Sequence, residues 1–430
     1  MRALSVVLCV SGLGAAASLG ACGGPRITDI CPAGCVKTAP PVDDFPLTTH
    51  AVDILFLIDN SPSMTPKQKA LAQNIPKFMQ KIDAAFPDYH VGIATSDIGT
   101  DQAPGLLWGG NIGTCDTFAG DDGQLQATPC TRRTSTTQEA RNACTTLCPD
   151  ERYVPIDGSH FIAKSDAGTN VPVKLEPDPM TGKMVDMGPI KAFQCMALVG
   201  DAGCGVEGQL EASRRALNGH HPDNAGFLRP GSFLAVIYVT DEDDCSVQLV
   251  RRREISPLTR DCDKAKPDDY DCYNVDYRCL ARSTQCNETL LTTGVKTGCR
   301  ERPGSFLEPT ENYYKFFSAL RLPSRLLISG IWTLPDISRG GRVEIVDQWG
   351  LHATPGLNRA PGLGASCSYA ADPSVYGQPQ HRLSKFAGAF GRKPDGTPAA
   401  LELSICDVDH YPDALAALAD TIVRSASFPG

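Results

Sequence analysis

Two stretches of the chain are almost continuously apolar. Residues 52–59 read VDILFLID, and residues 233–240 read FLAVIYVT. Apolar runs of this length are typical of strands that are buried on both faces, as in a parallel sheet. The pattern therefore predicts two central strands of a protein that mixes helices and strands.

The segment after the first run changes to a helical period. Apolar residues recur at helical spacing from Leu71 to Ile82, which gives the helix one buried face. Thr65 and Gln68, with a proline between them, resemble a capping box at its start. Residues 90–96 then predict a second strand. This strand–helix–strand order predicts a parallel, right-handed βαβ unit.

The same alternation resumes further along the chain. The other predicted strands are residues 158–164, 326–333 and 401–406, and the other predicted helices lie within residues 191–217, 312–320 and 383–390 and around residues 415–422. Alternating strands and helices predict an α/β fold of the Rossmann-like kind. Its sheet is expected to be doubly wound, mostly parallel and flanked by helices.

Three long stretches interrupt this alternation, at residues 98–157, 242–308 and 334–380. Loops of this length are uncommon in compact domains unless they are functional or separately stabilised. Without them, residues 50–430 hold one domain of ordinary size. Each stretch leaves the carboxyl end of a predicted strand. We therefore expect these insertions to gather on one rim of the sheet and to wall the site there.

The eighteen cysteines indicate how the insertions are stabilised. The first insertion holds four and the second holds six, so each can close its own disulfides. The others in the domain then pair as Cys195 with Cys204 and Cys367 with Cys406. Structural zinc is a weaker alternative, because Cys144 and Cys148 lack the two-residue spacing and the histidine partners that zinc sites prefer.

The first residues are typical of an export signal. A basic start and an apolar stretch end in LGAC at residues 19–22, which resembles the bacterial lipobox. We expect residues 1–21 to be a signal peptide, Cys22 to be lipid-modified, and residues 22–49 to be a tether. An ordinary secretory signal is the alternative. The expected location is the bacterial cell envelope, and Gly23 in place of an aspartate favours the outer membrane.

The chain is acidic, with a formal net charge of −9. Such a protein is a poor partner for nucleic acid or for an anionic lipid surface. After the signal, no segment reaches the roughly 20 apolar residues that a helix needs to cross a bilayer. We therefore expect the protein to meet the membrane only through its lipid anchor, and its partner to be a protein or another envelope ligand.

Small side chains with oxygen atoms follow both central strands. Asp59, Ser61 and Ser63 come after the first apolar run, and Asp241 comes after the second. The carboxyl ends of parallel strands open on the same crevice. Mg²⁺ prefers oxygen ligands and is often held by only one or two carboxylates. These four residues therefore predict a magnesium-type site, with Mn²⁺ or Ca²⁺ as alternative ions.

This D-x-S-x-S pattern with a later aspartate resembles the metal-ion-dependent adhesion site of von Willebrand factor type A domains, in particular the cysteine-rich versions in bacterial lipoproteins. The resemblance covers most of residues 50–430. It implies that Ser61 and Ser63 bind the ion directly and that Asp59 and Asp241 act through water. It also implies that an acidic group of a partner completes the coordination. The implied protein is an adhesion module and not an enzyme.

One ligand of the resembling family is missing. The family usually adds a threonine from a loop before a middle helix, whereas residues 200–207 contain none. Asp201 and Glu207 are the candidates to replace it, and Asp201 is included in the expected ligand set. An additional carboxylate lowers the electrophilicity of the ion. Recognition of a partner's acidic group is then expected to weaken.

Two other functions stay open. A metal-free scaffold for an envelope assembly keeps the fold, and Asp59 and its serines then only cap the first helix. A secreted hydrolase is disfavoured, because the sequence contains neither G-x-S-x-G nor H-E-x-x-H. Its tempting histidines, at residues 159–160 and 220–221, lie in polar stretches and are expected to be exposed. The acidic run at residues 242–244 is expected to be a solvated turn.

Overall fold

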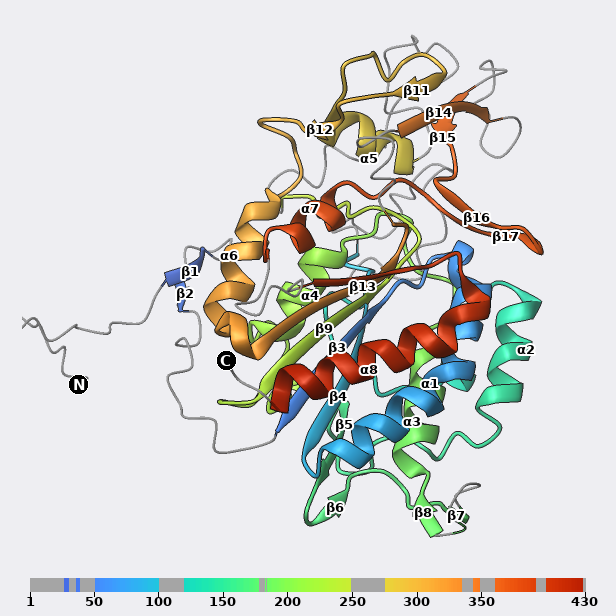
Figure 1. Ribbon diagram of the computed structural model, residues 1–430, viewed down its shortest axis with the longest axis vertical. Helices are drawn as coiled ribbons and strands as arrows, with labels where there is room; N and C mark the ends of the chain where they lie inside the picture. The colour runs from blue at the N-terminus through green and yellow to red at the C-terminus, as the bar shows by residue number, and fades with distance from the viewer. Residues whose placement is uncertain are drawn as a thin grey trace, which may run out of the picture.

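The computed structural model describes residues 27–30, 36–38, 51–99, 120–177, 182, 184–248, 275–334, 343–348, 360–391 and 400–427 (Figure 1). The expected signal peptide, Cys22 and most of the expected tether lie outside these residues. The short strands β1 (Ile27–Ile30) and β2 (Val36–Thr38) pair with each other in the tether region. None of the helices in the described part of the chain has the length and apolarity that a bilayer crossing requires.

A seven-stranded sheet forms the centre of the molecule, in the order β18-β13-β9-β3-β4-β5-β6. The strands from β18 to β4 run parallel, and β5 and β6 continue the sheet antiparallel. The predicted mostly parallel α/β sheet is confirmed. The strand bounds are β3 (Val52–Ile58), β4 (Tyr89–Thr95), β5 (Phe161–Ser165), β6 (Gly168–Thr169), β9 (Phe233–Val239), β13 (Leu326–Trp332) and β18 (Ala400–Ser404).

Helices cover both faces of this sheet, which explains why its central strands are apolar at almost every position (Figure 1). Along β3, Ile54 and Phe56 point into one core, and Leu55 and Leu57 point into the other. The first core includes residues of α1, α3 and α8, and the second includes residues of α4, α6 and α7. The helix bounds are α1 (Thr65–Ala85), α3 (Gly188–Ala197), α4 (Gln209–Leu217), α6 (Thr310–Leu320), α7 (Arg382–Gly388) and α8 (Tyr411–Ser427).

The strand order reverses at β3. The chain adds β4 on one side of β3 and later adds β9, β13 and β18 on the other side. β3 pairs with both β4 and β9 over its whole length, from Val52 to Ile58. In open α/β sheets ligands bind at such a switch point, beyond the carboxyl ends of the strands. The ends of β3 and β9 are therefore where a site is expected.

The start of α1 differs from the predicted capping box. A short 3-10 turn, η1 (Pro62–Met64), leads into the helix, and no side chain caps its first turn. The Gln68 side-chain amide donates instead to the Asp59 and Gly200 carbonyls, both at 2.8 Å. The capping-box prediction was wrong, because Gln68 satisfies buried carbonyls in neighbouring loops.

The second and third insertions form one small subdomain, at the top of Figure 1. Strand β11 of the second insertion pairs with β14, and β14 pairs with β15 of the third. Tyr277 and Leu280 of α5 share a small core with Val343 and Ile345 of β14. The bounds are α5 (Val275–Ser283), β10 (Thr284–Gln285), β11 (Gly294–Lys296), β12 (Arg300–Glu301), β14 (Val343–Gln348), β15 (Ala360–Leu363), β16 (Cys367–Tyr369) and β17 (Asp372–Gly377).

The remaining described elements are short or belong to the first insertion and its flank. They are α2 (Gln138–Leu147), β7 (Leu175–Pro177), β8 (Met184–Asp186), η2 (Cys130–Arg132), η3 (Pro222–Asn224), η7 (Pro323–Arg325) and η9 (Val408–His410). Helix α2 contacts α1 and α3. The part of the first insertion that contains α2 therefore packs on the same face of the sheet as these two helices, whereas Leu125 packs in the core on the other face.

Disulfides tie the insertions to the domain. Those joining described cysteines are Cys130–Cys144, Cys148–Cys195, Cys245–Cys279, Cys286–Cys299 and Cys367–Cys406. The expected pairing of Cys195 with Cys204 was wrong, because Cys195 bonds Cys148 of the first insertion; Cys204 is disulfide-bonded too. The first insertion is thus cross-linked to α3 instead of closing only on itself. Parity of cysteine counts cannot reveal which cysteines are neighbours in space.

Candidate metal crevice

The ends of β3 and β9 bring distant residues into contact. Asp59 and Asp241 lie directly beyond the two strand ends, and both side chains are fully buried. The Ser63 hydroxyl donates to Asp241 Oδ1 at 3.1 Å, although the two residues are 178 positions apart. The two predicted halves of the site therefore meet in one crevice.

Hydrogen bonds fix the loop that carries the serines. Asp59 Oδ1 accepts from the Ser61 backbone amide at 2.8 Å, and Asp59 Oδ2 accepts from the Thr240 hydroxyl at 2.7 Å. The Ser61 and Ser63 hydroxyls lie 3.1 Å apart. Ser61 is buried, whereas Ser63 is partly exposed. The crevice thus presents two adjacent hydroxyls on a restrained loop, one of which reaches solvent.

A lysine completes the crevice. Lys67 lies on the first turn of α1, is fully buried, and forms an ion pair with Asp241 Oδ2. Its ammonium also donates to the Ser63 carbonyl at 3.1 Å. Burial raises the pKa of Asp241 to about 6, although Lys67 lowers it. Lys67 was not among the site residues predicted from the sequence, although its position four residues before Leu71, on the apolar face of α1, indicates a buried charge.

A third carboxylate at the crevice belongs to Glu207. Its side chain is buried, and Oε2 accepts from the Gln209 side-chain amide at 2.9 Å. Burial raises the pKa of Glu207 well above its usual range, and the nearby Asp59 carboxylate raises it further. Glu207 therefore places a buried carboxyl group beside Asp59, where it can contribute a ligand oxygen to a divalent cation.

Asp201, the other candidate to replace the missing threonine, faces the first insertion. One of its oxygens accepts from the Thr136 amide at 2.5 Å, and the other accepts from the Thr137 hydroxyl at 2.6 Å and from the Thr65 hydroxyl at 3.1 Å. These contacts anchor the start of α2, where Thr137 is the N-cap. Asp201 therefore anchors the first insertion, and its role as a metal ligand stays a prediction. Glu207 is the acidic residue whose side chain interacts with Asp59.

Replacing Asp201 with alanine is expected to lower the free energy of unfolding by about 1–3 kcal/mol, because buried donors lose their acceptor. The variant should still respond to Mg²⁺ as the wild type does. Urea denaturation and thermal melts with and without Mg²⁺ test both statements. Glu207→Gln is the matched comparison and should reduce the Mg²⁺ response. A folded Asp201→Ala protein without any response would make Asp201 a ligand after all.

The chemistry of these groups fits a hard divalent cation. The donors are two hydroxyls and the carboxylates of Asp59, Asp241 and Glu207, and such oxygen sets suit Mg²⁺, Mn²⁺ or Ca²⁺. A buried oxygen next to the site, Asn60 Oδ1, has no hydrogen-bond partner within the described residues. One feature opposes the fit. The Lys67 ammonium already neutralises Asp241.

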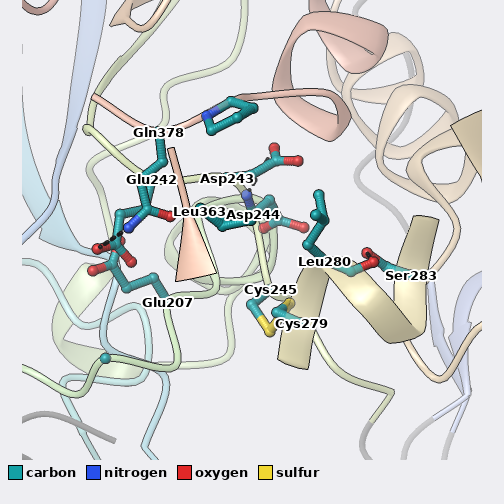
Figure 2. Close-up of a pocket in the computed structure, with 12 residues that line it drawn as sticks. Glu207, Glu242, Asp243, Asp244, Cys245, Cys279, Leu280, Ser283, Leu363 and Gln378 are labelled. Carbon is teal, nitrogen blue, oxygen red and sulfur yellow. Dashed lines mark hydrogen bonds between the residues drawn. A yellow bond between two sulfur atoms is a disulfide. The ribbon is translucent and has the colours of Figure 1, made fainter. Parts of the chain in front are cut away.

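Two pockets flank the crevice, and the insertions line both of them. The first, of about 380 Å³, contains Glu207 and Glu242 on one side and residues of α5 on the other (Figure 2). The second, of about 660 Å³, contains Asn60 together with Arg132 and Arg133 of the first insertion. All three insertions thus contribute to the rim of the sheet that carries the crevice, as the strand-end argument led us to expect.

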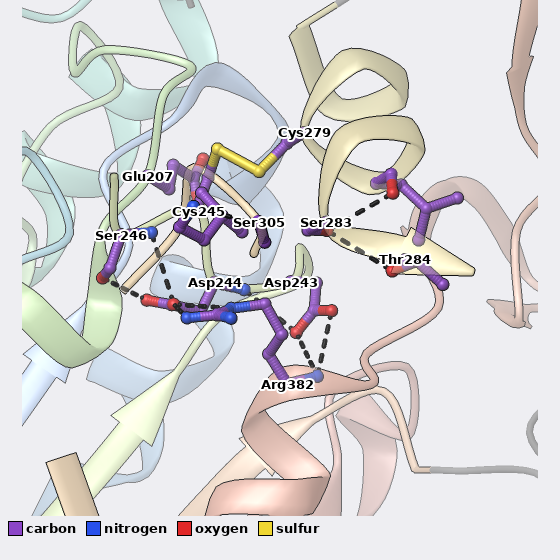
Figure 3. The surroundings of a disulfide bond; sticks show 12 residues. Glu207, Asp243, Asp244, Cys245, Ser246, Cys279, Ser283, Thr284, Ser305 and Arg382 are labelled. Atoms are coloured by element: carbon purple, nitrogen blue, oxygen red, sulfur yellow. Dashed lines mark hydrogen bonds and ion pairs between the residues drawn. A yellow bond between two sulfur atoms is a disulfide. The ribbon is translucent and has the colours of Figure 1, made fainter. Parts of the chain in front are cut away.

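The acidic run at residues 242–244 is not a solvated turn, contrary to the prediction. Asp243 accepts from the backbone amides at the start of α7, including Arg382 at 3.1 Å. The buried Asp244 pairs with the Arg382 guanidinium at 3.0 Å and accepts from the Ser246 hydroxyl at 2.6 Å (Figure 3). Helix α7 and the second insertion thereby hold the chain that follows Asp241.

The two predicted exposed histidines at residues 220–221 have an acidic neighbour. Asp122, His220 and His221 place three potential metal-ligating atoms within 4.8 Å of one another. His220 Nε2 lies 2.8 Å from Asp122 Oδ2, and Arg215 forms an ion pair with the other oxygen of Asp122. His221 Nε2 lies 2.8 Å from the Asp122 carbonyl. Because Arg215 already balances the carboxylate, we interpret this cluster as a tie between the first insertion and the end of α4.

Comparison with known proteins adds little to this picture. No protein-family model and no curated protein matches the chain. Among solved structures, the chain is similar to the pilus adhesin RrgA from Streptococcus pneumoniae, with 11% sequence identity, a TM-score of 0.27 and 90% of this chain covered. The match covers 46% of that protein, so this chain spans about half its length. A likeness with so low a TM-score carries no argument about function.

Proposed function

We propose that this protein is a binding module of the bacterial cell envelope with a von Willebrand factor type A-like fold. Asp59, Ser61, Ser63 and Asp241 would hold a magnesium-type ion, with Glu207 as an additional carboxylate. The hydrogen bond between the Ser63 hydroxyl and Asp241 carries the proposal. It joins the ends of two neighbouring parallel strands at the switch point of the sheet, where such folds bind ligands.

The proposed ligand is an acidic group of a protein or of another envelope molecule. When bound, the ion supplies a positive centre for a carboxylate oxygen. The chain's own contribution is preorganisation, because the Asp59 hydrogen bonds restrain the serine loop before any ligand arrives. The partly exposed Ser63 lies at the entrance.

The two flanking pockets favour one direction of approach. Four acidic residues and no basic residue line the first pocket, namely Glu207, Glu242, Asp243 and Asp244, which makes it the less favourable side for an acidic ligand. The second pocket contains both signs of charge, with Arg132 and Arg133 beside Asp97 and Asp121. Arg132 forms an ion pair with Glu151, whereas Arg133 donates to uncharged acceptors, the Thr128 carbonyl and the Gln126 side chain. We propose that the acidic group enters over the pocket that contains Arg132 and Arg133, so the first insertion would contribute to specificity.

Residues outside the crevice support the proposed location in the cell envelope and argue against a hydrolase. The LGAC sequence at residues 19–22 supports a lipid anchor at Cys22, with residues 22–49 as the tether. Against a hydrolase, the Ser159 hydroxyl donates to Asp157 at 2.7 Å, while His160 Nδ1 contacts the Leu125 carbonyl at 2.9 Å. This serine and this histidine are therefore committed to separate structural contacts.

Addition of Mg²⁺ or Mn²⁺ to the purified domain is expected to raise its melting temperature. Linkage sets the scale, since a ligand at 100 times its dissociation constant adds about 2.7 kcal/mol of stability. Asp59→Ala should abolish this increment, because it removes a carboxylate of the crevice. Asp150→Ala, which removes a partly exposed aspartate paired with Arg152, is the matched control and should keep the increment.

A metal-free scaffold is the second candidate, and the ion pair between Lys67 and Asp241 is the observation that favours it. In that case the wild type and Asp59→Ala would melt at temperatures that no divalent cation changes. The insertions would then carry the binding surface, and a chelator would leave any partner bound. An envelope pull-down with and without chelator separates the two functions.

A further inference from the structure

Lys67 is a buried charge whose partner is one of the proposed metal ligands. Its side chain is 0% exposed, and that of Asp241 is 1% exposed. An ammonium is buried at a large cost in free energy unless an opposite charge and hydrogen bonds compensate it. The compensating groups here are the Asp241 carboxylate and the Ser63 carbonyl, which lies in the same loop as the serine hydroxyls.

The geometry places two cations in competition for one carboxylate. Asp241 receives the Ser63 hydroxyl on Oδ1 and the Lys67 ammonium on Oδ2, so both of its oxygens are engaged. A divalent ion that uses Asp241 and Ser63 would lie within a few ångströms of the ammonium. Like charges repel strongly at such a distance in a site that excludes water. The ion therefore binds only with a displacement of Lys67 or against its repulsion.

We infer that Lys67 is a built-in cation of the crevice, which neutralises Asp241 when no divalent ion is present and must give way when one binds. This inference rests on the proposed function, since it concerns regulation of the same site. The tethered ammonium sets a threshold concentration of free divalent cation. Below the threshold the crevice is closed by its own lysine, and above it the crevice opens to an acidic ligand.

The third insertion supplies a place for the displaced ammonium. The ring centroid of Tyr376, on β17, lies 5.0 Å from Lys67 Nζ. An aromatic face attracts an ammonium, and the attraction is stronger where water is excluded. Lys67 can thus leave Asp241 and remain near the Tyr376 ring, which links the state of the crevice to the third insertion.

The test is the affinity of the full-length mature protein for Mg²⁺ and Mn²⁺, measured by isothermal titration calorimetry. Lys67→Gln removes the charge and keeps a hydrogen-bond donor, and it is expected to tighten the dissociation constant about tenfold or more. Lys69→Gln is the matched control, because Lys69 lies on the same helix, is 44% exposed and pairs with Glu139 at the surface. Its dissociation constant should stay at the wild-type value.

The thermal stability of Lys67→Gln and the Mg²⁺ affinity of a second variant, Tyr376→Leu, test the inference independently. Without ions Lys67→Gln should melt below the wild type, because Asp241 loses its counter-charge, and Mg²⁺ should close this gap. Tyr376→Leu leaves α1 intact and is expected to weaken Mg²⁺ binding roughly threefold, since the displaced ammonium loses the ring. This second readout applies even if Lys67→Gln does not fold without ions.

Each outcome has one meaning. Tighter binding by Lys67→Gln supports the built-in cation, including the case in which the wild type shows no measurable binding. Equal or weaker binding by Lys67→Gln, with normal binding by the wild type, overturns the inference and makes Lys67 a residue that only positions Asp241. If neither protein binds either ion, the proposed function itself fails, and the inference falls with it.

Discussion

Replacement of Arg382 by methionine is expected to lower the free energy of unfolding by about 3–5 kcal/mol, which is the usual cost of leaving buried charges without their partner. The Arg382 side chain is 2% exposed and pairs with the fully buried Asp244 at 3.0 Å and with Glu301 at 2.8 Å. It also donates to the Glu308 carbonyl at 2.6 Å. Equilibrium denaturation in urea measures the loss.

The reason for so large an effect lies in where Arg382 is placed. It joins α7 to the chain after Asp241, as Figure 3 shows, and its ion pair with Glu301 joins α7 to β12 of the second insertion. Methionine fills a similar volume, so the lost stability reports the charge and hydrogen bonds. The double variant Arg382→Met/Asp244→Asn removes both charges and should recover part of the loss. An additive or greater loss in the double variant would contradict this account.

Removal of the disulfide between Cys148 and Cys195 is expected to cost the second largest amount. Its sequence separation is 47, and the loop-entropy estimate for a loop of that length is about 4 kcal/mol. Cys148→Ala/Cys195→Ala avoids burying new polar groups. The first insertion would then lose its covalent link to α3 and would stay on α1 and α3 through packing and polar contacts, such as those of Asp201 and the Lys69–Glu139 ion pair. Denaturation under oxidising conditions measures the cost.

A second disulfide provides the control for this experiment. Cys286–Cys299 closes a separation of only 13 residues, for which the same estimate gives about 3 kcal/mol. The longer bond should therefore contribute about 1 kcal/mol more than the shorter one. If removal of the shorter disulfide destabilised the protein more, chain entropy would not account for the order of the two effects. Poorer packing within the subdomain of the second and third insertions would then be the cause.

The ion pairs of Arg382 and the Cys148–Cys195 disulfide have a common functional consequence. Arg382 holds the chain that follows Asp241, and the Cys148–Cys195 disulfide holds the insertion that carries Arg132 and Arg133. The first supports one strand end of the crevice, and the second supports the wall over which we propose that the ligand enters. Loss of either support is expected to disturb ligand recognition before it disturbs the central sheet, because β3 and β9 lie between two layers of helices.

The positions of the proposed ligands were predictable because they depend on local chain geometry and on one general rule of topology. A strand buried on both faces must be apolar at nearly every position, so β3 and β9 could be recognised from the sequence. Parallel neighbours end on the same side of a sheet. The meeting of Ser63 with Asp241 follows from these two facts, and the structure places them 3.1 Å apart.

The disulfide partner of Cys195 and the role of Asp201 could not be predicted in the same way. Cys195 and Cys204 are close in sequence, yet Cys195 lies on α3, against which the first insertion packs with Cys148. Asp201 stands near the expected ligand position, yet Thr136 and Thr137 of the same insertion occupy its oxygens. The wrong disulfide partner and the unforeseen contacts of Asp201 have one cause, because periodicity says nothing about where a long irregular segment folds back.

The sequence by itself determined the buried strands, the helices between them and the oxygen-rich turns at two strand ends, because each of these is written in the local alternation of apolar and polar residues. Only the tertiary structure decided that Lys67 neutralises Asp241 and that Glu207 is the third carboxylate of the crevice. It also decided that Arg382 holds the acidic residues 242–244 in place. Those pairings depend on which side chains are buried together. A buried charge is costly in free energy unless a partner compensates it, and the order of residues along the chain does not show which partner that is.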